Sequence, residues 1–260
     1  MSYAINTLSP TMRLTDAVGM GLIPGARRIN KLGYNADING TTQEDLWAPG
    51  GTMTVLVGAQ ALEVVSTDNT NDKAAGTGAL TVKISYLTTA YVEKSEIVTM
   101  NGTVAVATTA TDIFRVNNFR VETAGATGAA TGTISLRRSG AGTNVSQIIP
   151  TQTRARNSMF TVPTGYKFII TSVSVGTGAA TVAAAYGKFT LRAYYSEISQ
   201  LKTTLEYPLI ELVAQASAAV ATDLSSAIPE GVDIRMTVIG NASTSGMAAN
   251  SSMDGILVPL

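Results

Sequence analysis

The segment Leu80-Thr81-Val82-Lys83-Ile84-Ser85-Tyr86 alternates apolar and polar side chains. Successive side chains of a β-strand point to opposite faces, so this alternation predicts a strand with one face on a hydrophobic core. Short stretches rich in Val, Ile, Thr and Tyr recur from residue 53 to residue 260, separated by Gly, Asn, Asp and Thr clusters. The sequence therefore predicts an all-β protein with one or two antiparallel β-sandwich or jelly-roll-like modules.

The first fifty residues differ from the rest, because glycine and proline interrupt them repeatedly and basic Arg27, Arg28 and Lys31 lie in the middle. We predict an extended N-terminal arm over residues 1–51, held by a neighbouring subunit or folded back on its own domain. A first β-sandwich-like module then covers residues 52–150 and a second β module covers residues 151–260. One continuous fold for the last two ranges stays an open alternative.

Three local patterns carry further expectations. Thr41 followed by Glu44 resembles a capping box and predicts a single helical turn that anchors Trp47, the sole tryptophan, in the core. Asn101-Gly102 predicts a type I′ hairpin that reverses the chain into residues 103–107. The apolar segment 254–260 is expected in a core or a subunit interface.

Composition excludes several classes of function. The 260 residues contain no cysteine and no histidine, which excludes disulfides, thiolate chemistry, Ser-His-Asp and Cys-His catalysis, and most zinc sites. Eighteen basic and eighteen acidic side chains cancel, and charged residues make up only 14% of the chain. We therefore expect neither a nucleic acid nor a membrane surface as partner, since both need a net basic face. A surface with so few charges favours association over life as a free monomer.

No apolar run approaches the roughly 20 residues needed to span a bilayer, and the first ten residues lack the pattern of a secretory signal. We expect a soluble protein that is synthesised in a cytoplasm.

Candidate sites are weak. Two of five carboxylates might pair as glycosidase acid and base, and these are Asp68, Asp72, Glu93, Glu96 and Glu122. The oxygen-rich loop from Asp68 through Asn71 to Asp72 resembles a calcium loop without the EF-hand spacing, and an ordinary Asn/Asp turn explains it as well. Cross-strand pairing or subunit contact explains a scatter of arginines at positions 115, 120, 137, 138, 154 and 156. We assign no catalytic, cofactor-binding or metal-binding residue, and no cofactor.

Several segments resemble a family of virion structural proteins of tailed bacteriophages. The similarity is carried by residues 30–38, 41–47, 50–51, 62–66, 71–79, 98–103 and 107–113, and more loosely by residues 160–165 and 232–235. These are turn and strand motifs, and the resemblance implies a particle component without a defined active site.

The resemblance and the low charge together predict a non-enzymatic capsid decoration or cement protein in the virion. The expected partner is the major capsid protein, and the expected assembly is a homotrimer, because closed oligomers cover strand edges. The alternative is a tail or head-fibre adhesin that binds a host glycan through Tyr186, Tyr194 and Tyr195.

Overall fold

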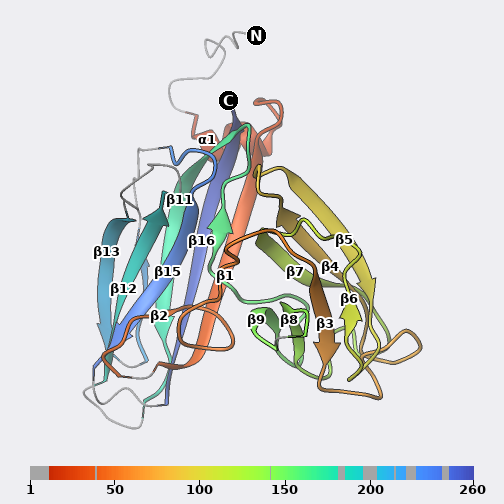
Figure 1. The fold of residues 1–260 in the computed structure, drawn as a ribbon. Coiled ribbons are helices and arrows are strands. Elements are labelled where there is room, and N and C mark those ends of the chain that lie inside the picture. The colour runs from red at the N-terminus through yellow and green to blue at the C-terminus, as the bar shows by residue number, and fades with distance from the viewer. Residues whose placement is uncertain are drawn as a thin grey trace.

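The computed structural model describes residues 12–38, 40–140, 142–180, 185–195, 204–213, 215–220, 227–241 and 246–260. These contain the short helix α1 (Leu14–Gly19) and strands β1 to β16, which pair antiparallel in four sheets (Figure 1). The predicted all-β class is confirmed, but the strand order is not clearly that of a jelly roll. Among the described residues, no helix is long and apolar enough to cross a membrane.

Two of the sheets come from one continuous stretch of chain, which we call the contiguous half. Their strand orders are β6-β3-β8-β9 and β5-β4-β7. Buried side chains of both sheets form one hydrophobic cluster between Leu56 and Ile148. The strands are β3 (Leu62–Ser66), β4 (Ala79–Leu87), β5 (Glu93–Thr99), β6 (Val106–Ala107), β7 (Arg115–Ala124), β8 (Ile134–Arg138) and β9 (Asn144–Ile148).

The other two sheets join both ends of the described chain, and we call them the split half. Their orders are β1-β16-β11-β14 and β10-β15-β12-β13, with β2 added beside β15, and they share a second cluster. The strands are β1 (Arg27–Ile38), β2 (Glu44–Asp45), β10 (Phe160–Thr161), β11 (Tyr166–Thr177), β12 (Tyr186–Tyr194), β13 (Thr204–Val213), β14 (Ser217–Val220), β15 (Asp233–Gly240) and β16 (Met247–Pro259).

Residues 27–38 and 44–45 are strands of the split half and not an extended arm. β1 pairs with β16 along its length, and the side chains of Ile38 and Leu46 are fully buried in the cluster of this half. The folded-back alternative therefore describes this segment, while residues 1–11 lie outside the described part of the chain. The predicted helical turn is wrong as well, because Glu44 lies in β2. Its carboxylate accepts from the Asn35 side chain and the Gly51 backbone instead of capping a helix.

The predicted hairpin at Asn101-Gly102 is also wrong. β5 pairs with β4, whereas β6 pairs with β3, so this turn carries the chain from one sheet of the contiguous half to the other. Gly102 has a φ of 62°, as a tight turn requires, and its amide donates to the Asp72 carbonyl. A turn sequence specifies a reversal of direction but not the partner of the next strand.

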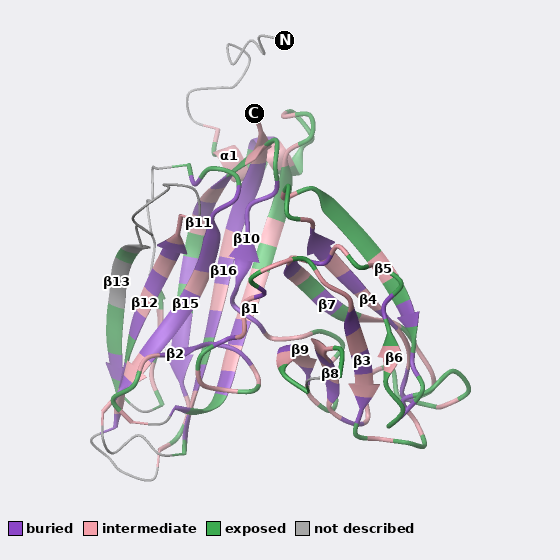
Figure 2. Ribbon diagram, in the orientation of Figure 1, coloured by how far each residue is buried: buried purple, intermediate pink, exposed green. Residues whose placement is uncertain are grey.

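β4 and β16 show how the pattern of side chains places strands in the cores. In β4, the alternating side chains Val82, Ile84 and Tyr86 are buried, as predicted (Figure 2). β16 lies between β1 and β11, and Ile256 and Leu257 of its apolar segment are buried, whereas Leu260 is 69% exposed, so the predicted core position is confirmed for part of the segment. Gly255 permits this packing, because a Cβ there would lie 2.3 Å from Cζ of Phe168.

Candidate functional site

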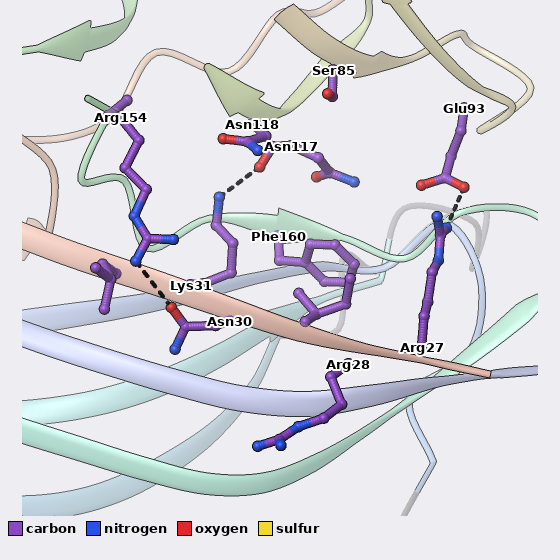
Figure 3. Close-up of a pocket in the computed structure, with 13 residues that line it drawn as sticks. Arg27, Arg28, Asn30, Lys31, Ser85, Glu93, Asn117, Asn118, Arg154 and Phe160 are labelled. Atoms are coloured by element: carbon purple, nitrogen blue, oxygen red, sulfur yellow. Dashed lines mark hydrogen bonds and ion pairs between the residues drawn. The ribbon is translucent and has the colours of Figure 1, made fainter. Parts of the chain in front are cut away.

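A cleft about 320 Å³ in volume lies where the two halves meet, and we call it the junction cleft (Figure 3). β1 of the split half supplies one wall. Residues of β4, β5 and β7 in the contiguous half supply the other, and Arg154 reaches in from the connection between the halves. The volume is at the lower end of the range for small-molecule sites.

Polar contacts cross the cleft at three places. Lys31 Nζ donates to the Asn117 carbonyl at 2.7 Å, and Arg154 Nη2 donates to Asn30 Oδ1 at 3.3 Å. At the other end Arg27 forms an ion pair with Glu93. These contacts hold β1 against β7 and β5, so the cleft walls are fixed by the packing of the two halves.

The cleft is electropositive at Lys31 and Arg154. Burial, and to a smaller extent the nearby charge of Arg154, lower the pKa of Lys31 to about 7. Glu93 is the one acidic residue among those lining the cleft, and Arg27 neutralises it. The arrangement suits the binding of a negative group and offers no acid and base pair for catalysis.

A buried ion pair also connects the two halves. Nε of Arg115 in β7 lies 3.0 and 2.9 Å from the two carboxylate oxygens of Asp233 in β15. Nη1 of Arg115 donates to the Leu56 carbonyl at 2.7 Å, and the Thr161 hydroxyl donates to Asp233 Oδ1 at 2.6 Å. Each charge is paired and hydrogen-bonded, so this is a structural contact.

A second pocket, about 390 Å³, contains two of the three tyrosines considered for glycan binding. Tyr194 and Tyr195 line it together with Val57 and Arg235, and the Arg235 guanidinium lies 4.5 Å from the centre of the Tyr194 ring. Tyr186 is at the opposite end of β12 and does not line it. Of the three tyrosines expected to bind a glycan, the structure thus brings together only Tyr194 and Tyr195.

The oxygen-rich loop is organised by its own protein donors. The Asp72 side chain is fully buried, and its oxygens accept five hydrogen bonds, from the Ser66 hydroxyl, the Thr131 amide and hydroxyl, and the amides of Ala79 and Gly132. Burial alone would raise the pKa of Asp72, but these donors outweigh it and lower that pKa. Asp68 accepts from Thr70 and Asn71, so the loop is an Asn/Asp turn.

The other carboxylates considered as a catalytic pair are also bonded locally. Glu93 pairs with Arg27, Glu122 pairs with Arg120, and Glu96 accepts from the amides of residues 109 and 110. No described contact joins two of the five carboxylates. Within the described ranges, no cluster of three His, Cys, Asp or Glu side chains could hold a metal ion.

The scattered arginines have separate roles. Arg120 forms an ion pair with Glu122 in the same strand, β7, and Arg137 in β8 forms one with Glu63 in the neighbouring strand β3. Arg156 donates to the Gln152 side chain. Sequence reasoning grouped them without finding that Arg154 faces Lys31. Arg154 lies in a connection between the halves, and no periodic pattern relates it to a residue of β1.

Trp47 is buried against Met53 and Met159, which confirms its predicted core position. Its indole Nε1 donates to the Gly50 carbonyl at 2.7 Å. The ring therefore anchors the segment that follows β2 and is not a ligand platform.

No protein-family model matches the sequence, and no curated protein matches it. Two solved structures from infectious bursal disease virus are distantly similar. One is described as the T13 IBDV viral particle, with 12% identity over 90% of this chain and 69% of that chain. The other is of the Gx strain, with 10% identity over 91% of this chain and 73% of that chain. Both have a TM-score of 0.24, which is too low to support a conclusion about this chain.

Proposed function

We propose that this protein is a structural component of a bacteriophage particle, a capsid decoration or cement protein that binds the shell and bridges neighbouring subunits. The observation that carries the proposal is that the few charged side chains are bonded within the chain. Most of the carboxylates form an ion pair with, or accept a hydrogen bond from, another group of the protein. They are Asp37, Glu44, Asp45, Glu63, Asp68, Asp72, Glu93, Glu96, Asp112, Glu122, Glu206, Glu211, Glu230, Asp233 and Asp254.

Internal pairing leaves little net field at the surface. A protein with weak electrostatic repulsion tolerates dense packing beside its neighbours, as a lattice of bound copies requires. A hydrolase would need carboxylates as acid and base, and in this protein most of them are already bonded to other groups of the chain. We therefore infer no catalytic activity, and an assay on capsular polysaccharide is expected to release no sugar.

Exposed apolar side chains near α1 provide a contact surface for the shell. Met20 and Leu22 are 58% and 52% exposed in the loop between α1 and β1. The loop packs beside the end of β16, since a Cβ at Gly25 would lie 2.9 Å from Pro259. Both residues belong to the segment expected to bridge subunits, so we place the bridging surface here and not on β1. Burial of such side chains at an interface is favourable.

The partner in this proposal is the major capsid protein, and the free protein is a homotrimer. β5 is an exposed edge strand, and no strand of the described residues pairs with its outer side, which a closed assembly would cover (Figure 2). Light scattering of the purified protein should then give three times the chain mass of 26.9 kDa. A mass of a single chain at micromolar concentration would contradict the trimer.

Quantitative mass spectrometry of gradient-purified particles tests the proposed role. A decoration protein should be present in a fixed ratio to the major capsid protein, with many copies per particle. Its absence from purified particles would overturn the proposal, and a few copies would favour the fibre alternative.

One observation favours that alternative, a tail or head-fibre adhesin that binds a host glycan. Tyr194 and Tyr195 share a pocket with Asp233 and Arg235, and aromatic rings beside polar groups suit sugars. However, Arg235 already lies over the Tyr194 ring, and Asp233 is bonded to Arg115 and Thr161. A glycan array tests it. Binding that Tyr195→Ala abolishes would support the adhesin, and an array without a hit would contradict it.

A further inference from the structure

Two cations of the junction cleft face each other without an acidic partner among the described residues. Lys31 Nζ donates to the Asn117 carbonyl, and Arg154 donates to the Asn30 side chain, so both partners are neutral. Figure 3 shows the two side chains side by side in the cleft, and after burial the Arg154 charge is the second cause that lowers the pKa of Lys31. Such a pair is unfavourable, and the repulsion is relieved either when Lys31 loses its proton or when a negative group lies beside both cations.

We propose that Lys31 and Arg154 bind an oxyanion, a phosphate or carboxylate group, in the junction cleft. An ammonium group has three N–H donors and a guanidinium group has five, and only one contact of each is made within the protein. Figure 3 shows the two side chains approaching the same part of the cleft from opposite walls, beside Asn118. Charge-assisted bonds from both cations would hold the anion.

The protein's own carboxylates do not fill this position. Glu93 pairs with Arg27 toward the other end of the cleft, and Asp254 accepts from the Asn30 amide on the adjacent strand. Arg28 also lines the cleft but lies on the other side of the β1 ribbon from Lys31 (Figure 3). The site therefore has two cations and room for a group of several atoms, since a water molecule occupies about 30 Å³.

This inference does not depend on the proposed role in a particle, because it concerns the chemistry of the cleft alone. Failure to find the protein in particles would leave the anion site in place. Loss of the anion site would leave the particle role in place.

The test follows the pKa of Lys31 by NMR in the full-length wild-type protein with isotope-labelled lysine. Titrations are run with inorganic phosphate, with glutarate, and with sodium chloride at the same ionic strength. A bound anion should raise the pKa of Lys31 by roughly one unit, whereas sodium chloride should not. A larger shift with phosphate points to a phosphate-bearing ligand, and a larger shift with glutarate points to carboxylates. No shift beyond that of sodium chloride with either anion overturns the proposal.

A pair of variants gives a second readout. Arg154→Gln should weaken binding of the more effective anion about tenfold, because it removes one of two charged partners. Lys167→Gln removes one positive charge from an exposed position of β11 and should bind like the wild type. Equal affinity of Arg154→Gln and Lys167→Gln would show that general charge, and not this site, attracts the anion.

Discussion

In the contiguous half each strand pairs with another between residues 62 and 148, whereas the split half pairs strands from opposite ends of the chain. Asn30 in β1 bonds to Asp254 in β16 across 224 positions. Both halves bury one cluster between two sheets, so their packing is alike and only the sequence distance differs. Long-range pairing requires closure of a long loop, and the intervening contiguous half must fit within that loop.

The strongest way to break this arrangement is to cut the buried ion pair between the halves. Arg115→Met leaves the buried Asp233 carboxylate without its cation, and we expect a loss of about 4 kcal/mol in the free energy of unfolding. Urea unfolding measures it.

The matched control is Arg120→Met, which removes an arginine of β7 whose ion pair with Glu122 is more exposed. Its expected cost is below about 1 kcal/mol. Equal effects of the two variants would show that Arg115 does not join the halves.

A change confined to the contiguous half is expected next in size. Asp72→Asn places an amide N–H₂ against donors that now point at a carboxylate oxygen, which should cost about 3 kcal/mol. Asp16→Asn in α1 is the control and should leave stability unchanged.

Because the pKa of Asp72 is lowered in the folded state, its contribution is present above the unfolded pKa of about 3.9 and is lost as the pH falls. A difference between wild type and Asp72→Asn that did not shrink in acid would contradict this account.

The split half can be probed at its central strand. Gly255→Ala places a methyl group against the buried Phe168 ring, and overpacking of this kind costs about 2 kcal/mol. Gly58→Ala meets no atom within 4 Å and serves as the control. If thermal unfolding showed that Gly58→Ala lowers stability more than Gly255→Ala, the close packing of β16 against Phe168 would be contradicted.

The smallest effect is expected at Lys31 in the junction cleft. Burial and the Arg154 charge together lower the pKa of Lys31 to about 7, so between pH 7 and the unfolded pKa of about 10.4 the unfolded chain binds more protons. The penalty for Lys31 is therefore full below pH 7 and disappears as the pH rises.

Stability of the wild type relative to Lys31→Met should accordingly increase by about 1 kcal/mol or more from pH 6 to pH 9, in a buffer without phosphate or carboxylates. Denaturant unfolding at several pH values measures this difference. A pH-independent difference would mean that Lys31 is solvated.

Sequence could predict elements whose signal is local. Alternation in β4 identified a half-buried strand, and the apolar residues near position 256 identified a core segment. The sequence did not predict strand β1, because Arg27, Arg28 and Lys31 give no amphipathic pattern and the partner strand β16 is far away in sequence. Asp72 shows the same limit in the candidate sites. A cluster of Asn and Asp has the same composition whether its oxygens face a cation or protein donors. The pairing of Lys31 with Arg154 depends on the docking of two halves, which no local pattern encodes.

The central claim, attachment to a capsid, is tested most directly by adding purified protein to particles that lack it and measuring cosedimentation. The account predicts saturable binding at a fixed ratio to the major capsid protein. It also predicts that replacing the exposed residues Met20 and Leu22 with serine abolishes binding. Val213 on β13 is similarly exposed, and Val213→Ser should leave binding unchanged. Wild-type protein that stays in the supernatant at all concentrations would contradict the account.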